Sequence, residues 1–320
     1  MACQVPDAED LEGFHNILSS GQSQHKEIPA ERLGMEISWR ELDPKRKWYG
    51  NVVQDYNAFD YKFFSKSSRE MASTDPQHRL ALQIEHIGCS MGVGNVDYEE
   101  GMACYPANAY SATGNLKNFL AGKVSHYFTI HQVCRSIING ECTAALAGGV
   151  NIITSPECYR NLAGASFLNP SRQWKYSTPR MMDIAETKVL ALFFLKKLSS
   201  AIAGGDQVLG VIGSTRFYQN QNCTAIIVPN VVLLSGFFLD VVRGAKLEPN
   251  KVSVVEVHGM GTPVGDSAEY EGVRRVFSGS ILPEVLSLIF VKGLVGYTEC
   301  ASGLVSLVKT LMIREGFIPP

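Results

Sequence analysis

The 320-residue sequence predicts a layered α/β fold. Short apolar runs rich in β-branched residues alternate with stretches whose apolar residues recur at helical spacing, which is typical of strands connected by helices. The hydrophobic share of 45% and the charged share of 19% indicate an ordinary globular chain with a sizeable core. Because no low-complexity linker divides the sequence, residues 1–320 are expected to form a single domain.

The composition excludes several classes of function. A formal net charge of -2 gives no electrostatic basis for binding nucleic acid or an anionic membrane. The eight cysteines are scattered without a CxxC pair, which indicates free thiols, a reducing compartment and no metal site, and no cofactor motif is present. Since the N-terminus has no charged region followed by an apolar one, and no apolar run reaches membrane-spanning length, a cytoplasmic protein is expected.

The first part of the chain contains more irregular sequence than the rest. Residues 1–70 scatter aromatic side chains among charges and prolines, which predicts a loop-rich segment wrapped on a core. A helix is expected to begin at Asp75, a residue suited to the N-cap, with Pro76 at the first helical position. The elements expected after it are a strand near 90–94, helices at 115–127 and 130–140, and a glycine-interrupted strand at 143–153.

The second part alternates strands and helices more regularly. Residues 188–195 and 208–212 predict adjacent strands, joined by a helix at 197–203 that Gly204 and Gly205 end. The elements expected after them are a helix at 231–244, a strand before His258, a strand at 286–292, a turn at 293–296 and a helix at 302–314.

His258 is the first candidate for chemistry. A β-branched run from Val254 ends at this histidine, and the chain then turns through three glycines and a proline before Asp266. In open α/β sheets ligands meet side chains at this end of a strand, so the imidazole could act as a hydrogen-bond donor or a base. The alternative is a core histidine bonded to the backbone, although the flanking glycines leave little bulk to bury it.

Two stretches, 254–266 and 291–303, occur in the order found in β-ketoacyl synthases, and the sequence resembles the ketosynthase domain of a fungal non-reducing polyketide synthase. Further matching stretches are residues 75–80, 106–114, 122–128, 140–151 and 316–320. The resemblance implies a thiolase-like fold with αβαβα layers, two similar halves at about 1–185 and 186–320, and a homodimer. It also implies a cysteine at a helix N-terminus that takes an acyl chain from a carrier protein, with two histidines and a lysine stabilising the enolate and oxyanions.

The sequence departs from this family pattern at the nucleophile. The Asp-Thr-Ala-Cys-Ser-Ser turn is absent, because the chain passes from His131 directly into Gln132 and the second half of the nucleophile's helix. Neither Cys134 nor Cys142 occupies the nucleophile position, so covalent condensation is not expected.

Two further departures concern the second histidine and the ends of the chain. Tyr297 occupies the position of the second histidine, and a phenol can donate a hydrogen bond but cannot replace an imidazolium near neutral pH. The chain begins within the first strand-turn and stops before the last strands, and the loop at 181–186 lacks its glycines, so both halves are expected to be incomplete. Dimerisation or a partner could cover an exposed sheet edge.

The resulting hypothesis is a pseudo-ketosynthase that binds a polyketide and catalyses a non-condensing step, such as cyclisation, aldol-type closure or isomerisation. His258 would be the base or proton shuttle, Tyr297 the hydrogen-bond donor and Lys292 the electrostatic stabiliser. Thr262, Cys300 and Cys223 are the candidates for substrate contact, although Cys300 could be an inert core thiol and Cys223 part of a packed loop.

Two alternatives remain open at the level of sequence. The chain could be a non-catalytic scaffold that pairs with an acyl carrier protein or a full-length polyketide synthase, through the family's dimer surface at 106–122. It could also be a degenerate or mis-spliced fragment of a synthase gene, because the junction between His131 and Gln132 is clean.

Overall fold

Four strands form the main sheet of the computed structural model, in the spatial order β1-β6-β5-β4. Their bounds are β1 Ala2–Gln4, β4 Cys89–Val93, β5 Ala144–Asn151 and β6 Val189–Lys196. β5 is antiparallel to β6 and parallel to β4, while β1 pairs antiparallel with the other side of β6. The parts of the chain that the structure describes are residues 2–8, 10–27, 49–50, 60–62, 67–76, 79, 89–93, 130–151, 189–217, 229–259, 263–277, 286–298 and 301–317.

A second, parallel pair of strands carries the histidine end of the chain. β7 (Val254–Glu256) pairs with β8 (Ser287–Ile289), and α11 (Pro263–Phe277) connects them as the helix of a βαβ unit. Because the strands are parallel, their carboxyl ends lie at the same edge. Residues that follow β7 and β8 are therefore brought close together.

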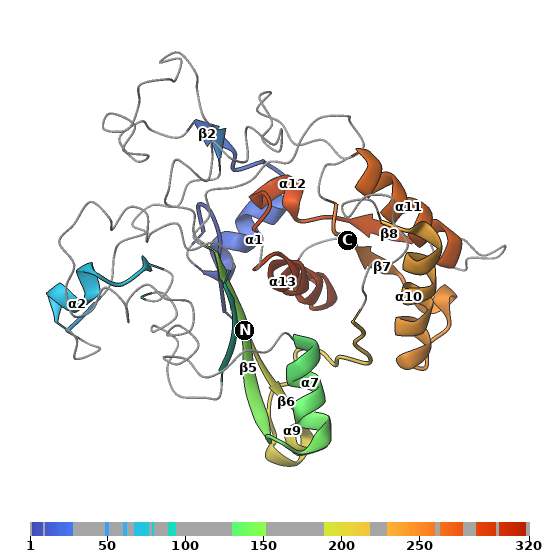
Figure 1. The fold of residues 1–320 in the computed structure, drawn as a ribbon, viewed down its shortest axis with the longest axis horizontal. Helices are drawn as coiled ribbons and strands as arrows, with labels where there is room; N and C mark the ends of the chain where they lie inside the picture. The colour runs from blue at the N-terminus through green and yellow to red at the C-terminus, as the bar shows by residue number, and fades with distance from the viewer. Residues whose placement is uncertain are drawn as a thin grey trace.

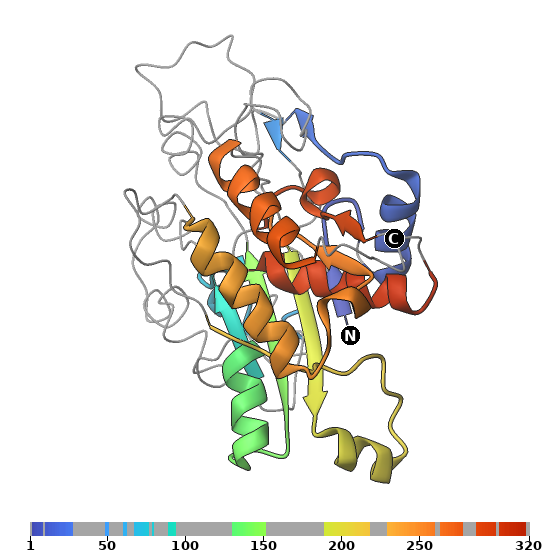
Figure 2. The same cartoon turned by 90° about the vertical axis from the view of Figure 1, so that its right-hand side faces the viewer.

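Helices separate the two sheets and cover the smaller one (Figure 1). α13 (Ser302–Arg314) and α7 (Ile130–Asn139) lie along one face of the main sheet, and β7 and β8 lie beyond α13. α10 (Val231–Gly244) and α11 pack against each other on the outer side, as the turned view shows clearly (Figure 2). This stacking of strands and helices confirms the layered α/β architecture predicted from the sequence.

The largest buried cluster joins the main sheet to α13. Val305 and Val308 of α13 and Ala191 of β6 have no exposed surface. Phe14 and Ile17 extend this cluster from α1 (Leu11–Ser20), near the N-terminus. A smaller cluster around Val257, Val273 and Phe277 holds α11 against β7.

The remaining described elements are short. They are β2 (Lys26–Glu27) paired antiparallel with β3 (Tyr49–Gly50), α2 (Ser68–Ala72), α9 (Leu198–Gly204), the 3-10 turn η2 (Pro249–Lys251) and α12 (Lys292–Val295).

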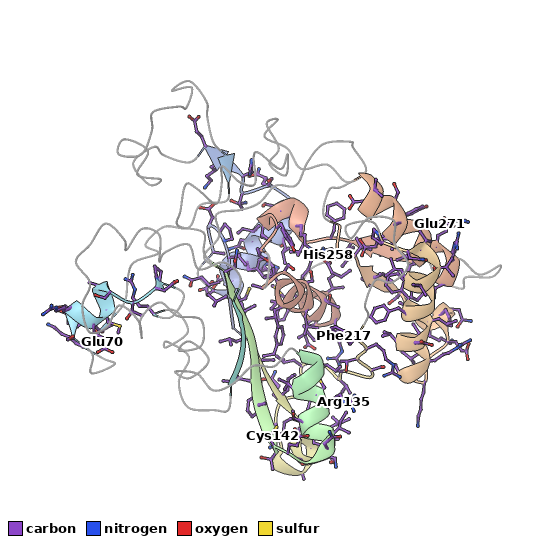
Figure 3. All side chains as sticks on the ribbon, in the orientation of Figure 1. Glu70, Arg135, Cys142, Phe217, His258 and Glu271 are labelled. Atoms are coloured by element: carbon purple, nitrogen blue, oxygen red, sulfur yellow. The ribbon has the colours of Figure 1, made fainter. Side chains whose placement is uncertain are left out.

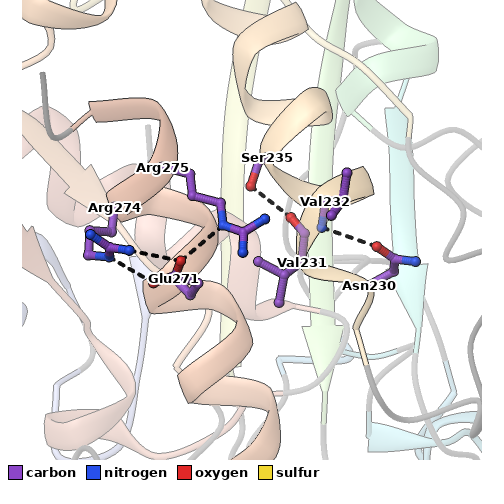
Figure 4. A network of polar contacts seen from close by, with 7 residues as sticks. All are labelled: Asn230, Val231, Val232, Ser235, Glu271, Arg274 and Arg275. Carbon is purple, nitrogen blue, oxygen red and sulfur yellow. Dashed lines mark hydrogen bonds and ion pairs between the residues drawn. The ribbon is translucent and has the colours of Figure 1, made fainter.

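The outer helices are held by local polar contacts (Figure 4). Asn230 caps α10 by accepting the backbone N–H groups of residues 232 and 233 at 3.1 and 3.2 Å. On α11 the Glu271 carboxylate pairs with Arg274 at 2.7 Å and Arg275 at 2.9 Å. Hydrogen bonds from these arginines lower the pKa of Glu271 to about 2. Because the arginines are exposed and Glu271 is half-buried, these pairs add little stability, and Glu271 is a suitable control for the buried acid Glu256.

The prediction of a loop-rich segment at 1–70 is wrong at its beginning. β1 adds a strand to the main sheet, and α1 is a regular helix whose Asp10 side chain accepts the N–H of Gly13 at 2.8 Å. Gly21 ends α1 in the left-handed region, with φ of 63°. The helix forms because Phe14 and Ile17, one turn apart, are both buried in the core.

Most of the elements predicted later in the chain are confirmed. β4, α7, β5, β6, α9, α10 and α13 lie where the sequence placed them. Residues 76 and 79 are helical, and the N–H of Arg79 donates to the carbonyl of Asp75 at 3.1 Å, which agrees with a helix beginning at Asp75.

Two predictions about the second part of the chain are wrong. Residues 208–212 do not form a strand beside β6, since they are irregular and Val211 is 62% exposed. Lys292 does not belong to a strand either, because β8 ends at Ile289 and Lys292 begins the short helix α12. The predicted turn at 293–296 is therefore mostly helical. The helix at 115–127, the surface at 106–122 and the loop at 181–186 lie outside the described residues.

Candidate functional site

His258 lies two residues beyond the end of β7, at the carboxyl edge of the parallel strand pair (Figure 3). Its backbone N–H donates to Oε1 of Glu269 at 2.6 Å, and the N–H of Gly259 donates to Oε2 at 2.9 Å. One carboxylate of α11 thus holds two successive peptide groups. Gly259 has φ of 48°, in the left-handed region that a residue with Cβ adopts less readily, so glycine allows the chain to turn away behind the histidine.

Lys292 meets His258 from the end of the neighbouring strand. Its Nζ atom lies 3.2 Å from Nδ1 of His258 and also donates a short hydrogen bond to the His258 carbonyl. The lysine is only 3% exposed, whereas His258 is an exposed residue. Since an ammonium group can only donate, Nδ1 is the acceptor, and the neutral ring carries its proton on Nε2.

Tyr297 completes the group of predicted residues. Its ring centroid is 5.9 Å from that of His258 at an interplanar angle of 87°, which is an edge-to-face contact. The Nζ atom of Lys292 lies 5.7 Å from the tyrosine ring centroid, within the range of a cation–π interaction. The aromatic ring therefore faces both members of the His258–Lys292 pair.

Desolvation and neighbouring charges set the protonation of this pair. Desolvation, with a smaller effect from the charge of Lys292, lowers the pKa of His258 from 6.5 to about 4. Desolvation also lowers the pKa of Lys292 from 10.5 to about 8, although the negative charges of Glu269, Glu256 and Asp266 oppose this shift. At neutral pH the site thus contains a neutral imidazole and an ammonium group that loses its proton more readily than a surface lysine.

The structure brings together three of the six predicted site residues. His258, Lys292 and Tyr297 form one contact group, whereas Thr262, Cys300 and Cys223 lie outside the described residues. The sequence interpretation left Glu256 and Glu269 without a role, although Glu256 stands in the motif before His258 and Glu269 follows that motif by three residues. Asp266 is 3% exposed in the first turn of α11, and its charge raises the pKa of Lys292.

A hollow of about 560 Å³ lies apart from this group of residues. It is lined by α7, β6, α9, residues 206–212 and the later part of α13, and its lining includes Cys134. Burial raises the pKa of the Cys134 thiol, which keeps it protonated and weakly nucleophilic. Lys196 and Asp206, which also line it, pair with each other at 2.6 Å. This hollow is mainly apolar and does not contain His258.

Within the described ranges no cluster of side chains is suited to holding a metal ion, and no helix is long and apolar enough to cross a membrane. Cys3, Cys134 and Cys142 are free.

The layered fold, with a lysine–histidine pair at the carboxyl edge of its smaller sheet, indicates a condensing-enzyme type of protein. Comparison with family models agrees, since the N-terminal domain of β-ketoacyl synthases matches residues 1–87 and 127–201, and the C-terminal domain matches residues 209–320. The chain belongs to the β-ketoacyl synthase family.

Its relatives are ketosynthase regions of fungal polyketide synthases. The chain is 59% identical to the citrinin polyketide synthase of Monascus ruber and 58% identical to the clavatol synthase of Penicillium crustosum. Each alignment covers the whole chain but only 14% of the relative. The alignments run over 356 positions, more than the 320 residues of the chain, so these relatives contain residues that this chain lacks.

Solved structures support the same fold. The oxazolomycin ketosynthase domain of Streptomyces albus superposes with a TM-score of 0.83 at 27% identity, covering 98% of this chain and 62% of that one. A ketosynthase of the bacillaene synthase from Bacillus subtilis superposes at 0.82, covering 98% of this chain and 60% of that one, and its 22% identity supports the fold alone. The fold is therefore thiolase-like.

Proposed function

We propose that this chain is a pseudo-ketosynthase that binds a polyketide intermediate and assists a non-condensing step, such as cyclisation by aldol-type closure. The supporting observation is the 3.2 Å contact from Nζ of Lys292 to Nδ1 of His258, which leaves the Nε2 proton available to a substrate oxygen. The sequence contains no Asp-Thr-Ala-Cys-Ser-Ser turn, so the step would proceed without an acyl-enzyme.

The geometry favours His258 as a donor and proton shuttle over His258 as an unaided base. In an aldol closure a base in the solvent removes an α-proton, the resulting enolate carbon attacks a carbonyl carbon, and the carbonyl oxygen becomes an alkoxide that must take up a proton. The Nε2 proton of His258 passes to this oxygen while the Lys292 ammonium returns a proton to Nδ1. The proton released to solvent restores the Lys292 ammonium after the relay, so the protons balance. The lowered pKa of Lys292, about 8, makes this transfer easier than it would be from an ordinary lysine.

Tyr297 would support the closure from the side. Its edge-to-face contact limits rotation of the His258 ring, and its phenol can donate a hydrogen bond near neutral pH. Thr262, Cys300 and Cys223 are retained as candidates for substrate contact.

The experiment is a turnover assay with a short poly-β-ketoacyl thioester of N-acetylcysteamine, followed by absorbance and mass spectrometry of the cyclised product. His258→Ala should lower the rate by roughly 100-fold or more, because a preorganised donor to the developing oxyanion is removed. Cys134→Ala should leave the rate unchanged, since the thiol is half-buried and kept protonated. Unchanged turnover in His258→Ala would exclude the assigned site, and loss of turnover in Cys134→Ala would exclude a non-covalent mechanism.

A non-catalytic role is the second candidate. If this chain only binds a full-length synthase, it does not need the nucleophile turn that the sequence lacks. In this role, the immobilised chain would still retain a full-length synthase or an acyl carrier protein after His258→Ala and Tyr297→Phe. Neither change would affect homodimerisation. Retention without any turnover would favour this role over the pseudo-ketosynthase.

Sequencing the transcript across the codons for His131 and Gln132 tests both candidates. An intact reading frame without the nucleophile segment supports them. Recovery of an Asp-Thr-Ala-Cys segment would overturn both and restore an ordinary condensing enzyme.

A further inference from the structure

The side chain of Glu256, the last residue of β7, joins three parts of the structure. Its Oε1 atom accepts the backbone N–H of Val291 at 2.7 Å and the hydroxyl of Ser306 at 3.4 Å. Its Oε2 atom lies 3.0 Å from Nζ of Lys309 on α13. The side chains of Glu256 and Lys309 are only 7% and 10% exposed, so this ion pair lies in the interior.

Glu256 connects the segment that leads to His258 with the segment that leads to Lys292. Glu256 stands two residues before His258, and Val291 stands directly before Lys292. The strand pairing between β7 and β8 ends near Ile289, whose carbonyl accepts the N–H of Val257 at 2.9 Å. Beyond that point the Glu256–Val291 hydrogen bond connects the two segments just before they reach the site.

The negative charge of Glu256 also affects the protonation of Lys292. A carboxylate in the interior requires a partner, because an uncompensated buried charge is strongly destabilising. Lys309 supplies that partner, with its Nζ atom 3.0 Å from Oε2 of Glu256. The negative charge of Glu256 raises the pKa of Lys292 and opposes the effect of burial, together with Glu269 and Asp266. Glu256 therefore helps to keep Lys292 as the ammonium that donates to His258.

We propose that Glu256 is a positioning residue that holds Lys292 against His258, with Lys309 of α13 as its counter-charge. The inference rests on the proposed function only in taking His258 and Lys292 as the functional pair. It assigns α13 a role in the site, because Ser306 and Lys309 of α13 contact Glu256.

The first test removes the charge and keeps the hydrogen-bond acceptor. In the double variant Glu256→Gln, Lys309→Met, the glutamine oxygen can still accept the N–H of Val291, and no unpaired lysine remains. The 15N and 13C NMR signals of the Lys292 side chain, assigned with Lys292→Arg, should report a pKa below its value of about 8 in the parent protein. The 15N shifts of the His258 ring should still report the Nε2–H tautomer at neutral pH.

The second test removes the acceptor as well. In Glu256→Val, Lys309→Met the ring 15N shifts of His258 should move towards the average of the two neutral tautomers, because Lys292 is no longer held at Nδ1. Glu271→Gln is the matched control, since Glu271 is a half-buried acid on α11 that pairs with Arg274, and this variant should change neither measurement. Lys309→Met alone should lower the melting temperature by roughly 5–10 °C, and adding Glu256→Gln should restore most of this loss.

These outcomes separate positioning from a purely structural role. If both double variants keep the parental Lys292 pKa and His258 tautomer, the proposal is wrong, whatever their melting temperatures. If the valine variant fails to fold, the Lys292 pKa in the glutamine variant decides the question. Because the spectra need no substrate, an inactive protein with the expected spectra would contradict the proposed function and leave the role of Glu256 standing.

Discussion

The Nζ atom of Lys292 lies 3.2 Å from Nδ1 of His258, and the two residues follow the ends of neighbouring parallel strands. This contact fixes which nitrogen of the ring accepts and which one can donate. It also explains why the site lies at this edge, since a parallel pair brings the residues after both strands together. The protonation state of His258 therefore depends on Lys292.

Lys292→Met should raise the pKa of His258, but not as far as its ordinary value of 6.5. The substitution removes the charge that helps to lower the histidine pKa, but desolvation, which is the larger cause, remains. The pKa of His258 should rise above about 4 and stay below 6.5, and the ring should lose its single tautomer. A pH titration followed by 15N NMR measures both effects. A pKa that stays near 4 would show that Lys292 does not act on the ring.

The titration of His258 should make the free energy of unfolding decrease as the pH falls from 6.5 to 4. Its pKa is lower in the folded protein than in the unfolded chain, so the unfolded chain binds more protons between pH 6.5 and 4. This contribution to stability is fully present above pH 6.5 and is lost as the pH falls towards 4. Urea titrations across this window should show a smaller decrease in His258→Gln than in the parent protein. Equal slopes would mean that the histidine is not desolvated.

The sequence predicted the part of the site that lies at the end of a strand. The β-branched run before His258 indicated the end of a strand, whereas Lys292 and Tyr297 were identified through the resemblance to β-ketoacyl synthases. Glu269 and Glu256 were not identified because their contacts depend on how α11 and α13 return against β7. Contacts between elements that are distant in the chain produce no repeating pattern in the sequence.

The errors in the fold have related causes. Residues 208–212 have the composition of a strand, but strand formation depends on a partner, and here these residues border an apolar hollow. The helix α1 was missed because its ten residues lie in a polar, aromatic context, whereas its formation depends on burying Phe14. In both places tertiary contacts decided the local structure.

Phe14→Ala tests whether α1 belongs to the core. The side chain is fully buried among residues of the main sheet and α13, so its truncation should cost about 3–5 kcal/mol of unfolding free energy. Phe217→Ala is the matched control, because Phe217 is 79% exposed, and it should change the free energy by less than about 0.5 kcal/mol. Urea denaturation measures both variants. Equal and small effects would mean that α1 does not pack as described.

Glu269→Gln should disturb the turn at His258 through both hydrogen bonding and charge. The carboxylate accepts two successive N–H groups, at 2.6 and 2.9 Å, whereas a glutamine amide presents one oxygen and turns its NH₂ group towards the second donor. The variant also loses the charge that most strongly raises the pKa of Lys292, so this pKa should fall below about 8. NMR titration of Lys292 and amide exchange of residues 258 and 259 measure the two effects, with Glu271→Gln as the control. A parental lysine pKa together with unchanged exchange at both amides would show that Glu269 does not hold the turn, and that the ring is positioned by Lys292 alone.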